Sequence, residues 1–370
     1  MLKLIYIPEA LRMLKRRLKV MLLGTKKYKG TPMEISKQII DDCWNNKYFK
    51  TSTGHFKEFW TRDFGICAES LLKLGYKKQV YSTLKYALEI FSKYRKITTT
   101  ITPYNIPFDF PAYSPDSLPF LIRSLRQLNK KELISQFKPF LNKEINKFYN
   151  IVLDKETGLV KKGKAFSSMK DNVMRCSSLY DNIMVAMLNN ELKKIKILNN
   201  PFKDYNFKKI IKSNFWTGEY FLDDLSGKQY ISGDANTFPY YTDVFTSKAM
   251  IKSSIASIEE EELDKPFPLK YTNNSKESKH FLFTDLFAPN YEGDTNWIHL
   301  GLCYIAVVNK VDKQKAKKYI EHYTQNIKKH RNFLEVFNNK KPYSSLFYYC
   351  DEGMLWVANY LYAKTKPTSP

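Results

Sequence analysis

The stretch 55–76, "HFKEFWTRDFGICAESLLKLGY", indicates how the rest of the chain is organised. Its second half has the period of an amphipathic helix that ends at Gly75. Another helix-forming stretch, 77–95, follows at once, so the two predict a helical hairpin. The first turn crowds an aromatic ring and an ion pair: Trp60, Arg62 and Asp63. These three residues form either a salt-bridged helix start or a pocket for a polar, flat-faced ligand such as a sugar.

The helical period returns along the whole chain, mostly in pairs joined by short turns. Further helices are predicted at 32–47, 116–128, 130–152, 171–195, 202–216, 240–262, 295–310, 313–330 and 351–364. Strand-like segments are few, and 218–224 with 228–232 predict one short β-hairpin insertion. No repeat of fixed length is present, which disfavours a solenoid array. Long loops rich in aromatics and carboxylates alternate with short turns, so we expect an all-α toroid of hairpins with its long loops around a central pocket.

No linker rich in Pro, Gly or Ser divides the chain, so we expect one main domain at 32–364, preceded by a basic helix or arm at 1–31 and followed by a tail at 365–370. Residues 2–23 alternate apolar and basic side chains, and no small-residue cleavage site follows them. This segment is either a packing helix or a basic amphipathic helix that makes peripheral contact with a membrane surface. The chain has no apolar run long enough to span a bilayer.

Composition excludes several classes of function. The net charge is +23, but the lysines are dispersed over helices and turns without a nucleic-acid-binding signature, so no nucleic-acid partner is expected. The five cysteines form no Cys-x-x-Cys pair, which indicates reduced thiols in a cytoplasmic protein. With only five histidines as well, we expect no metal site and no cofactor. The sequence leaves the oligomeric state open.

Acidic residues gather at the junctions between loops and helices, beside aromatic or Asn side chains. Each acid can be interpreted as a helix N-cap, above all Asp116, Asp171 and Asp294. Glu335 differs because it lies between Phe333 and Phe337, where a carboxylate is costly unless it is paired or protonated. The candidate residues at these junctions are Asp116, Asp171, Asn172, Asp234, Asn236, Glu292, Asp294, Trp297 and Glu335.

Hydrolysis of a glycoside needs this set of groups. A carboxylic acid protonates the leaving oxygen, while a second carboxylate activates water on the opposite face of the sugar. In inverting enzymes the two carboxyl groups stand about 6.5–9.5 Å apart to admit that water. Arg and Asp side chains bind ring hydroxyls and Trp or Tyr rings pack against the sugar. We therefore expect an oligosaccharide or glycoside as the substrate.

Four short motifs, whose order along the chain matches that of the family, resemble the six-hairpin glycosidases, the (α/α)6 toroids that include glucoamylases, trehalases and processing α-glucosidases. "FWTRDF" is similar to their Trp-x-Arg-Asp junction, which implies that Trp60, Arg62 and Asp63 hold the terminal sugar. "SMKDN" takes the place of their Gly-Trp-Asp segment, with Met169 and Lys170 replacing Gly and Trp, and implies that Asp171 is the general acid. "FLEVFNNKKPYSS" resembles their last long loop and implies that Glu335 is the general base.

The fourth motif, "YEGDTNWIHLG", resembles the Gly-Pro-x-Trp stretch that lines the pocket, with Asp294 in place of Pro. The resemblance spans roughly residues 32 to 364 and implies an inverting, exo-acting hydrolase of an α-glucoside or related oligosaccharide. It further implies that Asp116, Asn172, Asp234, Asn236, Glu292, Asp294 and Trp297 contact the substrate. Two alternatives stay open: a uronide hydrolase or phosphorolytic enzyme on the same toroid, for which the basic charge is suited, and a toroid that binds glycans without cleaving them.

Overall fold

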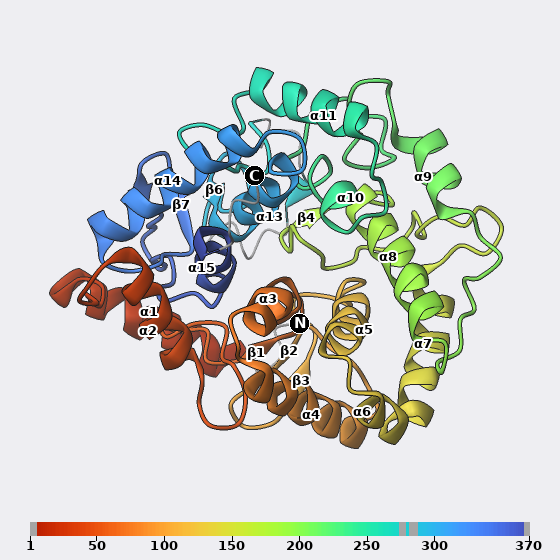
Figure 1. Cartoon of the computed structure of the whole chain (residues 1–370), viewed down its shortest axis with the longest axis horizontal. Coiled ribbons are helices and arrows are strands. Elements are labelled where there is room, and N and C mark those ends of the chain that lie inside the picture. Colours follow the sequence, from red (N-terminus) through yellow and green to blue (C-terminus); the bar gives the residue numbers. More distant parts are fainter. Residues whose placement is uncertain (1–5, 274–278, 281–287, 366–370) are drawn as a thin grey trace.

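The computed structural model describes residues 6–273, 279–280 and 288–365, and its helices form two concentric rings (Figure 1). In the inner ring each helix contacts the next, and the last contacts the first, which closes the ring. The inner helices are α3 (Thr61–Lys73), α5 (Ser117–Leu128), α8 (Leu179–Ile195), α10 (Phe238–Tyr241), α13 (Ile298–Val308) and α15 (Val357–Thr365). This arrangement confirms the predicted all-α toroid.

The outer ring alternates with the inner one along the sequence, so each outer helix packs against an inner neighbour. Its members are α2 (Pro32–Cys43), α4 (Lys77–Tyr94), α6 (Lys131–Gln136) followed by α7 (Lys138–Val152), α9 (Phe207–Phe215), α11 (Lys248–Glu260) and α14 (Lys313–His330). The two rings share one continuous apolar core. Helices α2 and α15 come from opposite ends of the sequence and pack together, which closes the toroid.

The connections differ in length at the two ends of the toroid. Short turns such as 74–76, 129–130 and 309–312 lead from inner to outer helices. Long segments lead from each outer helix to the next inner one and therefore meet at one end, as the sequence predicted. These long loops are 44–60, 95–116, 153–178, 216–237, 261–297 and 331–356, and 261–297 includes residues outside the described part of the chain.

Small antiparallel sheets brace the long loops. One joins β1 (Phe59–Trp60), β2 (Thr100–Ile101) and β3 (Pro107–Phe108), and a second pairs β4 (Val173–Met174) with β5 (Lys279–His280). A third joins β6 (Asn296–Trp297), β7 (Val336–Asn338) and β8 (Lys341–Pro342). The predicted hairpin of 218–224 with 228–232 is reduced to one isolated bridge between Leu222 and Ile231. The sheets were not predicted, because strands of two or three residues leave no periodic pattern.

Several predicted helices begin later than expected because capping residues determine their starts. The helix predicted at 171–195 begins at Leu179, where the Ser178 hydroxyl accepts the Asp181 N–H, and β4 occupies part of the preceding stretch. The helix predicted at 240–262 begins at Lys248 after the Ser247 cap. The stretch 130–152 divides into α6 and α7 because Pro139 stands in the first turn of α7 and has no N–H to continue α6.

The interpretation of three acids as helix caps is wrong. Asp116 precedes α5 but makes no side-chain cap bond. Asp171 lies eight residues before α8, which Ser178 caps, and Asp294 lies before Trp297, the N-cap residue of α13. The carboxylates of these residues are therefore available for other contacts.

Helix α1 (Tyr6–Leu23) lies outside the rings, beside α2 (Figure 1). Its buried Arg16 donates to the carbonyl oxygens of Tyr349 at 2.9 Å and Cys350 at 2.8 Å. None of the helices in the described residues is long and apolar enough to cross a membrane. The predicted tail, apart from Thr365, lies outside the described residues, and the division into arm, domain and tail stays a prediction.

Candidate active site

Arg62, at the start of α3, is the centre of a cluster of three acids, Asp63 from α3 itself and Asp116 and Asp171 from two long loops. Its guanidinium donates to both carboxylate oxygens of Asp171, at 2.8 and 3.2 Å, and lies 3.4 Å from Asp116 and 3.8 Å from Asp63. It also donates to the carbonyl oxygen of Ser168. The two-pronged contact with Asp171 suits the planar fork of an arginine and fixes the carboxylate in direction as well as in position. Besides the ion pair within one turn that the sequence suggested, Arg62 therefore joins the start of α3 to two long loops.

The neighbours of Arg62 leave unused hydrogen-bonding capacity. Asp63 accepts the indole N–H of Trp356 at 3.0 Å through one oxygen, and its other oxygen has no hydrogen-bond partner among the described residues. Burial raises the pKa of Asp63 to about 6, against the opposing charge of Arg62. The buried indole N–H of Trp60 also has no partner within the described part of the chain. An acceptor and a donor of this kind are what a ligand hydroxyl requires.

Asp116 belongs to the same cluster through its ion pair with Arg62. It accepts hydrogen bonds from Tyr180 at 3.0 Å and Ser114 at 2.5 Å, in addition to its ion pair with Arg62. The residue is fully buried, and burial raises its pKa. These contacts favour a role in holding Arg62.

Asp171 keeps part of its side chain exposed and has a second carboxyl group close by. The hydroxyl of Ser167 donates to Asp171 at 2.6 Å. Glu292 accepts the backbone N–H groups of Asp171 at 3.0 Å and Asn172 at 2.7 Å. Burial, followed by the negative charge of Asp171, raises the pKa of Glu292 to about 8. Near neutral pH, Glu292 therefore carries a proton beside Asp171.

Glu335 is only 2% exposed. It lies among hydrogen-bond donors from its own loop, 331–356, and from the loop 261–297. It accepts the hydroxyl groups of Tyr291 at 2.5 Å and Tyr348 at 2.7 Å, and the backbone N–H of Asp351 at 2.7 Å. Burial, and next the negative charge of Asp351, raise the pKa of Glu335 to about 7. A carboxyl group with such a pKa can exchange a proton at neutral pH.

Two adjacent residues connect the predicted catalytic groups. Glu292 holds the backbone of Asp171, and Tyr291, its neighbour in the chain, holds Glu335. Asp171 and Glu335 are 164 positions apart in the sequence, yet both contact the 291–292 segment at the loop end of the toroid. Trp297 contributes to the same wall, since its indole N–H donates to the Tyr291 carbonyl oxygen at 2.9 Å and its ring lies edge-on to Tyr291.

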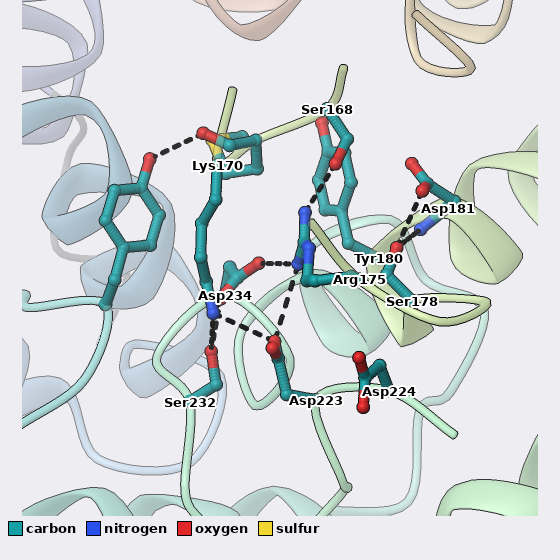
Figure 2. A network of polar contacts seen from close by, with 12 residues as sticks. Ser168, Lys170, Arg175, Ser178, Tyr180, Asp181, Asp223, Asp224, Ser232 and Asp234 are labelled. Atoms are coloured by element: carbon teal, nitrogen blue, oxygen red, sulfur yellow. Dashed lines mark hydrogen bonds and ion pairs between the residues drawn. The ribbon is translucent and has the colours of Figure 1, made fainter. Parts of the chain in front are cut away.

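A buried ionic network holds the loop that carries Asp171 (Figure 2). Lys170, which has no exposed surface, donates to Asp223 at 2.9 Å and Ser232 at 2.8 Å and lies 3.3 Å from Asp234. Arg175 donates to Asp234 at 2.9 Å, lies 3.4 Å from Asp223 and donates to the Ser168 hydroxyl. Two cations thus face two carboxylates between the loops 153–178 and 216–237. Burial opposes charge on Asp223, but Lys170 and Arg175 hold its pKa well below the usual range.

The remaining predicted residues make different contacts. Asp234 is fully buried within the ionic network, and the amide of Asn236 bonds to the backbone of Phe221 and Ser232. Asn172 is buried next to Asp171. Asp294 is exposed and receives a hydrogen bond from Asn290. The structure therefore brings Arg62, Asp63, Asp116, Asp171 and Glu292 into one cluster, with Glu335 linked to it through Tyr291.

A cavity of about 480 Å³ opens beside β4, between the loops that the ionic network joins. Its lining carries several cations and one carboxylate: Lys162, Lys164, Arg175, Lys228 and Asp224. Among the described residues no group of three or more His, Cys, Asp and Glu side chains is arranged to hold a metal ion.

Sequence reasoning missed Lys170, Arg175 and Asp223 as parts of the site, and it missed the tyrosines around Glu335. Lys170 stood out only as a departure from the Trp of related motifs. A signal was present, because a lysine inside an otherwise apolar and small-residue segment requires a buried acid as its partner.

The chain was compared with protein-family models, with curated proteins and with solved structures. No protein-family model matches the chain, and no curated protein matches it in sequence. Solved structures do match: a rhamnosidase from Klebsiella oxytoca with rhamnose bound superimposes with a TM-score of 0.63 at 11% identity, over 91% of this chain and 64% of that one. A glycosidase in complex with glucose gives a TM-score of 0.62 at 9% identity, over 96% of this chain and 97% of the other.

A bacterial glucoamylase complexed with acarbose gives a TM-score of 0.63 at 13% identity, over 89% of this chain and 54% of that one. This chain spans less than two thirds of the rhamnosidase and of the glucoamylase, and 97% of the glycosidase. At such low identities the similarity concerns the fold. With its closed inner ring, alternating outer ring and long loops at one end, the chain has the (α/α)6 six-hairpin toroid that these glycosidases share.

Proposed function

We propose that the protein is an inverting, exo-acting glycoside hydrolase for an α-glucoside or a related oligosaccharide. The observation that carries the proposal is the link of Asp171 and Glu335 through the adjacent residues Glu292 and Tyr291, at the loop end of a glycosidase-type toroid. Similar structures described as holding rhamnose, glucose and acarbose support a carbohydrate as the ligand.

In this proposal Glu335 is the general base. It removes a proton from the attacking water, a role for which a pKa near the operating pH is most effective. The burial that raises the pKa of Glu335 to about 7 provides this property, and the hydroxyl groups of Tyr291 and Tyr348 fix the direction of the carboxylate.

Asp171 is the proposed general acid, which delivers a proton to the leaving oxygen. Arg62 and Ser167 orient its carboxyl group, and Glu292 holds its backbone. Glu292 is a positioning residue that also keeps a proton next to Asp171, because its pKa is raised to about 8.

In this proposal the sugar is held by groups that have no hydrogen-bond partner among the described residues. The second oxygen of Asp63 and the indole N–H of Trp60 can accept from and donate to ring hydroxyls. Since both side chains come from the start of α3, beside Arg62, they define the subsite for the terminal sugar.

A substrate panel tests this proposal. Purified protein is incubated with p-nitrophenyl α-glucoside, p-nitrophenyl α-rhamnoside, trehalose, maltooligosaccharides and unsaturated uronides, and released sugar is measured. We expect release from at least one α-glycoside and a loss of at least about 10³-fold in Glu335→Gln, the order of magnitude of general base catalysis. Glu132→Gln is the matched control, because Glu132 is exposed on the outer helix α6 and this variant should stay active. Release from none of the substrates, or full activity in Glu335→Gln, would contradict the proposal.

The basic cavity favours a second candidate, an enzyme that acts on an acidic glycan or uses phosphate. Lys162, Lys164 and Lys228 line it with a single opposing carboxylate, Asp224. Such a site would bind a uronate or a phosphate ion. Preferential cleavage of the uronides would support an acidic substrate, and release that depends on added phosphate would support phosphorolysis. A toroid that binds glycans without cleavage would instead retain sugar from the panel and release none.

A further inference from the structure

Helix α1 turns a mixed side toward the protein, in which Arg12 and Arg16 lie beside the apolar Met13 and Val20. Arg16 is buried against the loop 331–356, where its guanidinium lies 3.3 Å from Asp351 in addition to its two carbonyl contacts. On the same side Arg12 pairs with the buried Glu58. A surface helix normally buries its apolar side and exposes its polar one. Helix α1 departs from this rule, because it buries Arg16 and leaves most of its large apolar side chains exposed.

The apolar side of α1 faces outward as a continuous stripe. Of the fifteen large apolar side chains that are exposed among the described residues, seven belong to this helix. All except Leu23, the last residue of the helix, recur at the spacing of one helical face, opposite Arg16, and the seven are 41–77% exposed. The seven residues are Ile7, Leu11, Leu14, Leu18, Met21, Leu22 and Leu23. A contiguous exposed apolar surface of this kind indicates an interaction site.

Basic side chains border this stripe on both sides. Lys15 and Lys19 are exposed along one edge, and Arg17 lies along the other. Arg17 also donates to the carbonyl oxygen of Ser345 at 3.1 Å, which brings the neighbouring Leu346, 78% exposed, close to this helix. This arrangement suits the surface of a bilayer, where apolar side chains can reach the acyl chains and the bordering cations can contact anionic headgroups.

We propose that the apolar stripe of α1 docks this protein peripherally on a membrane surface that contains anionic lipids. The Leu, Ile and Met side chains enter the headgroup boundary, while Lys15, Lys19 and Arg17 contact lipid phosphates. Because Arg16 binds the loop that carries Glu335 and Asp351, docking brings this loop of the toroid toward the headgroups.

Charge argues against a second copy of the chain as the occupant of the stripe. Each copy carries a net charge of +23, and the cations bordering the two stripes would meet across a dimer interface. Like charges in contact oppose association, whereas an anionic surface attracts both the helix and the rest of the protein.

Sedimentation with lipid vesicles tests this proposal without any need for a substrate. The full chain is mixed with vesicles of phosphatidylcholine and phosphatidylglycerol at a ratio of 7:3, and with vesicles of phosphatidylcholine alone. The test variant is Leu11→Ser/Leu18→Ser/Leu22→Ser. The matched control, Met33→Ser/Tyr104→Ser/Ile106→Ser, removes three exposed apolar side chains outside α1. Thermal unfolding verifies that each variant is folded.

We expect the wild-type chain to bind the anionic vesicles more tightly than the neutral ones, with binding that weakens as salt rises. The α1 variant should lose at least tenfold in apparent affinity, and the control should bind like wild type. The proposal is overturned if wild type stays in the supernatant or if the α1 variant binds equally well. It is also overturned if light scattering finds a wild-type dimer that the α1 variant converts to a monomer.

Discussion

At the residue scale, the environment of Glu335 controls its protonation through opposing effects. Burial and the charge of Asp351 raise its pKa, whereas the hydroxyl groups of Tyr291 and Tyr348 stabilise the carboxylate and lower it. The result, a pKa of about 7, means that a base at this position becomes active as the pH rises through neutrality.

Removal of one tyrosine hydroxyl should shift this transition. In Tyr348→Phe the carboxylate of Glu335 loses the hydrogen bond of 2.7 Å, so its pKa rises. We expect the acidic limb of the pH profile of kcat/KM to move upward by about one unit, since a hydrogen bond to a charged group contributes about 1.5–3 kcal/mol. Tyr240→Phe is the control, because its hydroxyl bonds to Met250 and Ser254. An unchanged acidic limb in Tyr348→Phe would exclude Glu335 as the base.

At the scale of elements, ion pairs between two long loops add to the pair that Arg62 of α3 makes with Asp171. Lys170 precedes Asp171 directly, and its ammonium group joins the loop 153–178 to Asp223 and Asp234 on the loop 216–237. Together with Arg175, the network contains two buried cations and two buried carboxylates, so its charges balance. The position of Asp171 therefore depends on a loop that contributes no predicted catalytic group.

Unbalancing this network should destabilise the fold. Lys170→Met leaves an excess negative charge and Asp234→Asn an excess positive one, so each should lower the free energy of unfolding by about 3–5 kcal/mol. The double variant keeps the pair of Arg175 and Asp223, and we expect it to lose less than the sum of the two single losses. Urea unfolding of the four proteins measures this coupling. Additive losses would mean that the two charges act independently.

At the scale of the whole molecule, the sequence predicted the toroid because its signal is long and repeated. Helical periodicity and the alternation of long and short connections extend over more than 300 residues, and the ring of α3, α5, α8, α10, α13 and α15 follows from them. Close contact between inner helices is also specified locally, since a Cβ atom on Gly65 of α3 would lie 2.5 Å from the Cβ of Phe120 on α5.

The site was predicted less completely than the fold. Motifs identified Arg62, Asp171, Glu292 and Glu335, but pairing across loops has no sequence period, so the contacts of Lys170 with Asp223 and of Tyr348 with Glu335 required the structure. Likewise, the sequence indicated an amphipathic α1 but not that Arg16 faces inward, because that orientation depends on acceptors more than 300 positions away.

The central claim is that Asp171 and Glu335 act together, from opposite sides of one sugar, as the acid and the base of an inverting hydrolysis. Proton NMR during the first minutes of cleavage of the best substrate from the panel tests this claim most directly, because it identifies the first anomer released. We expect wild type to release the sugar of inverted configuration first, and Asp171→Asn and Glu335→Gln to release none while they unfold at temperatures close to wild type. A first product of retained configuration, or continued release by either variant, would contradict it.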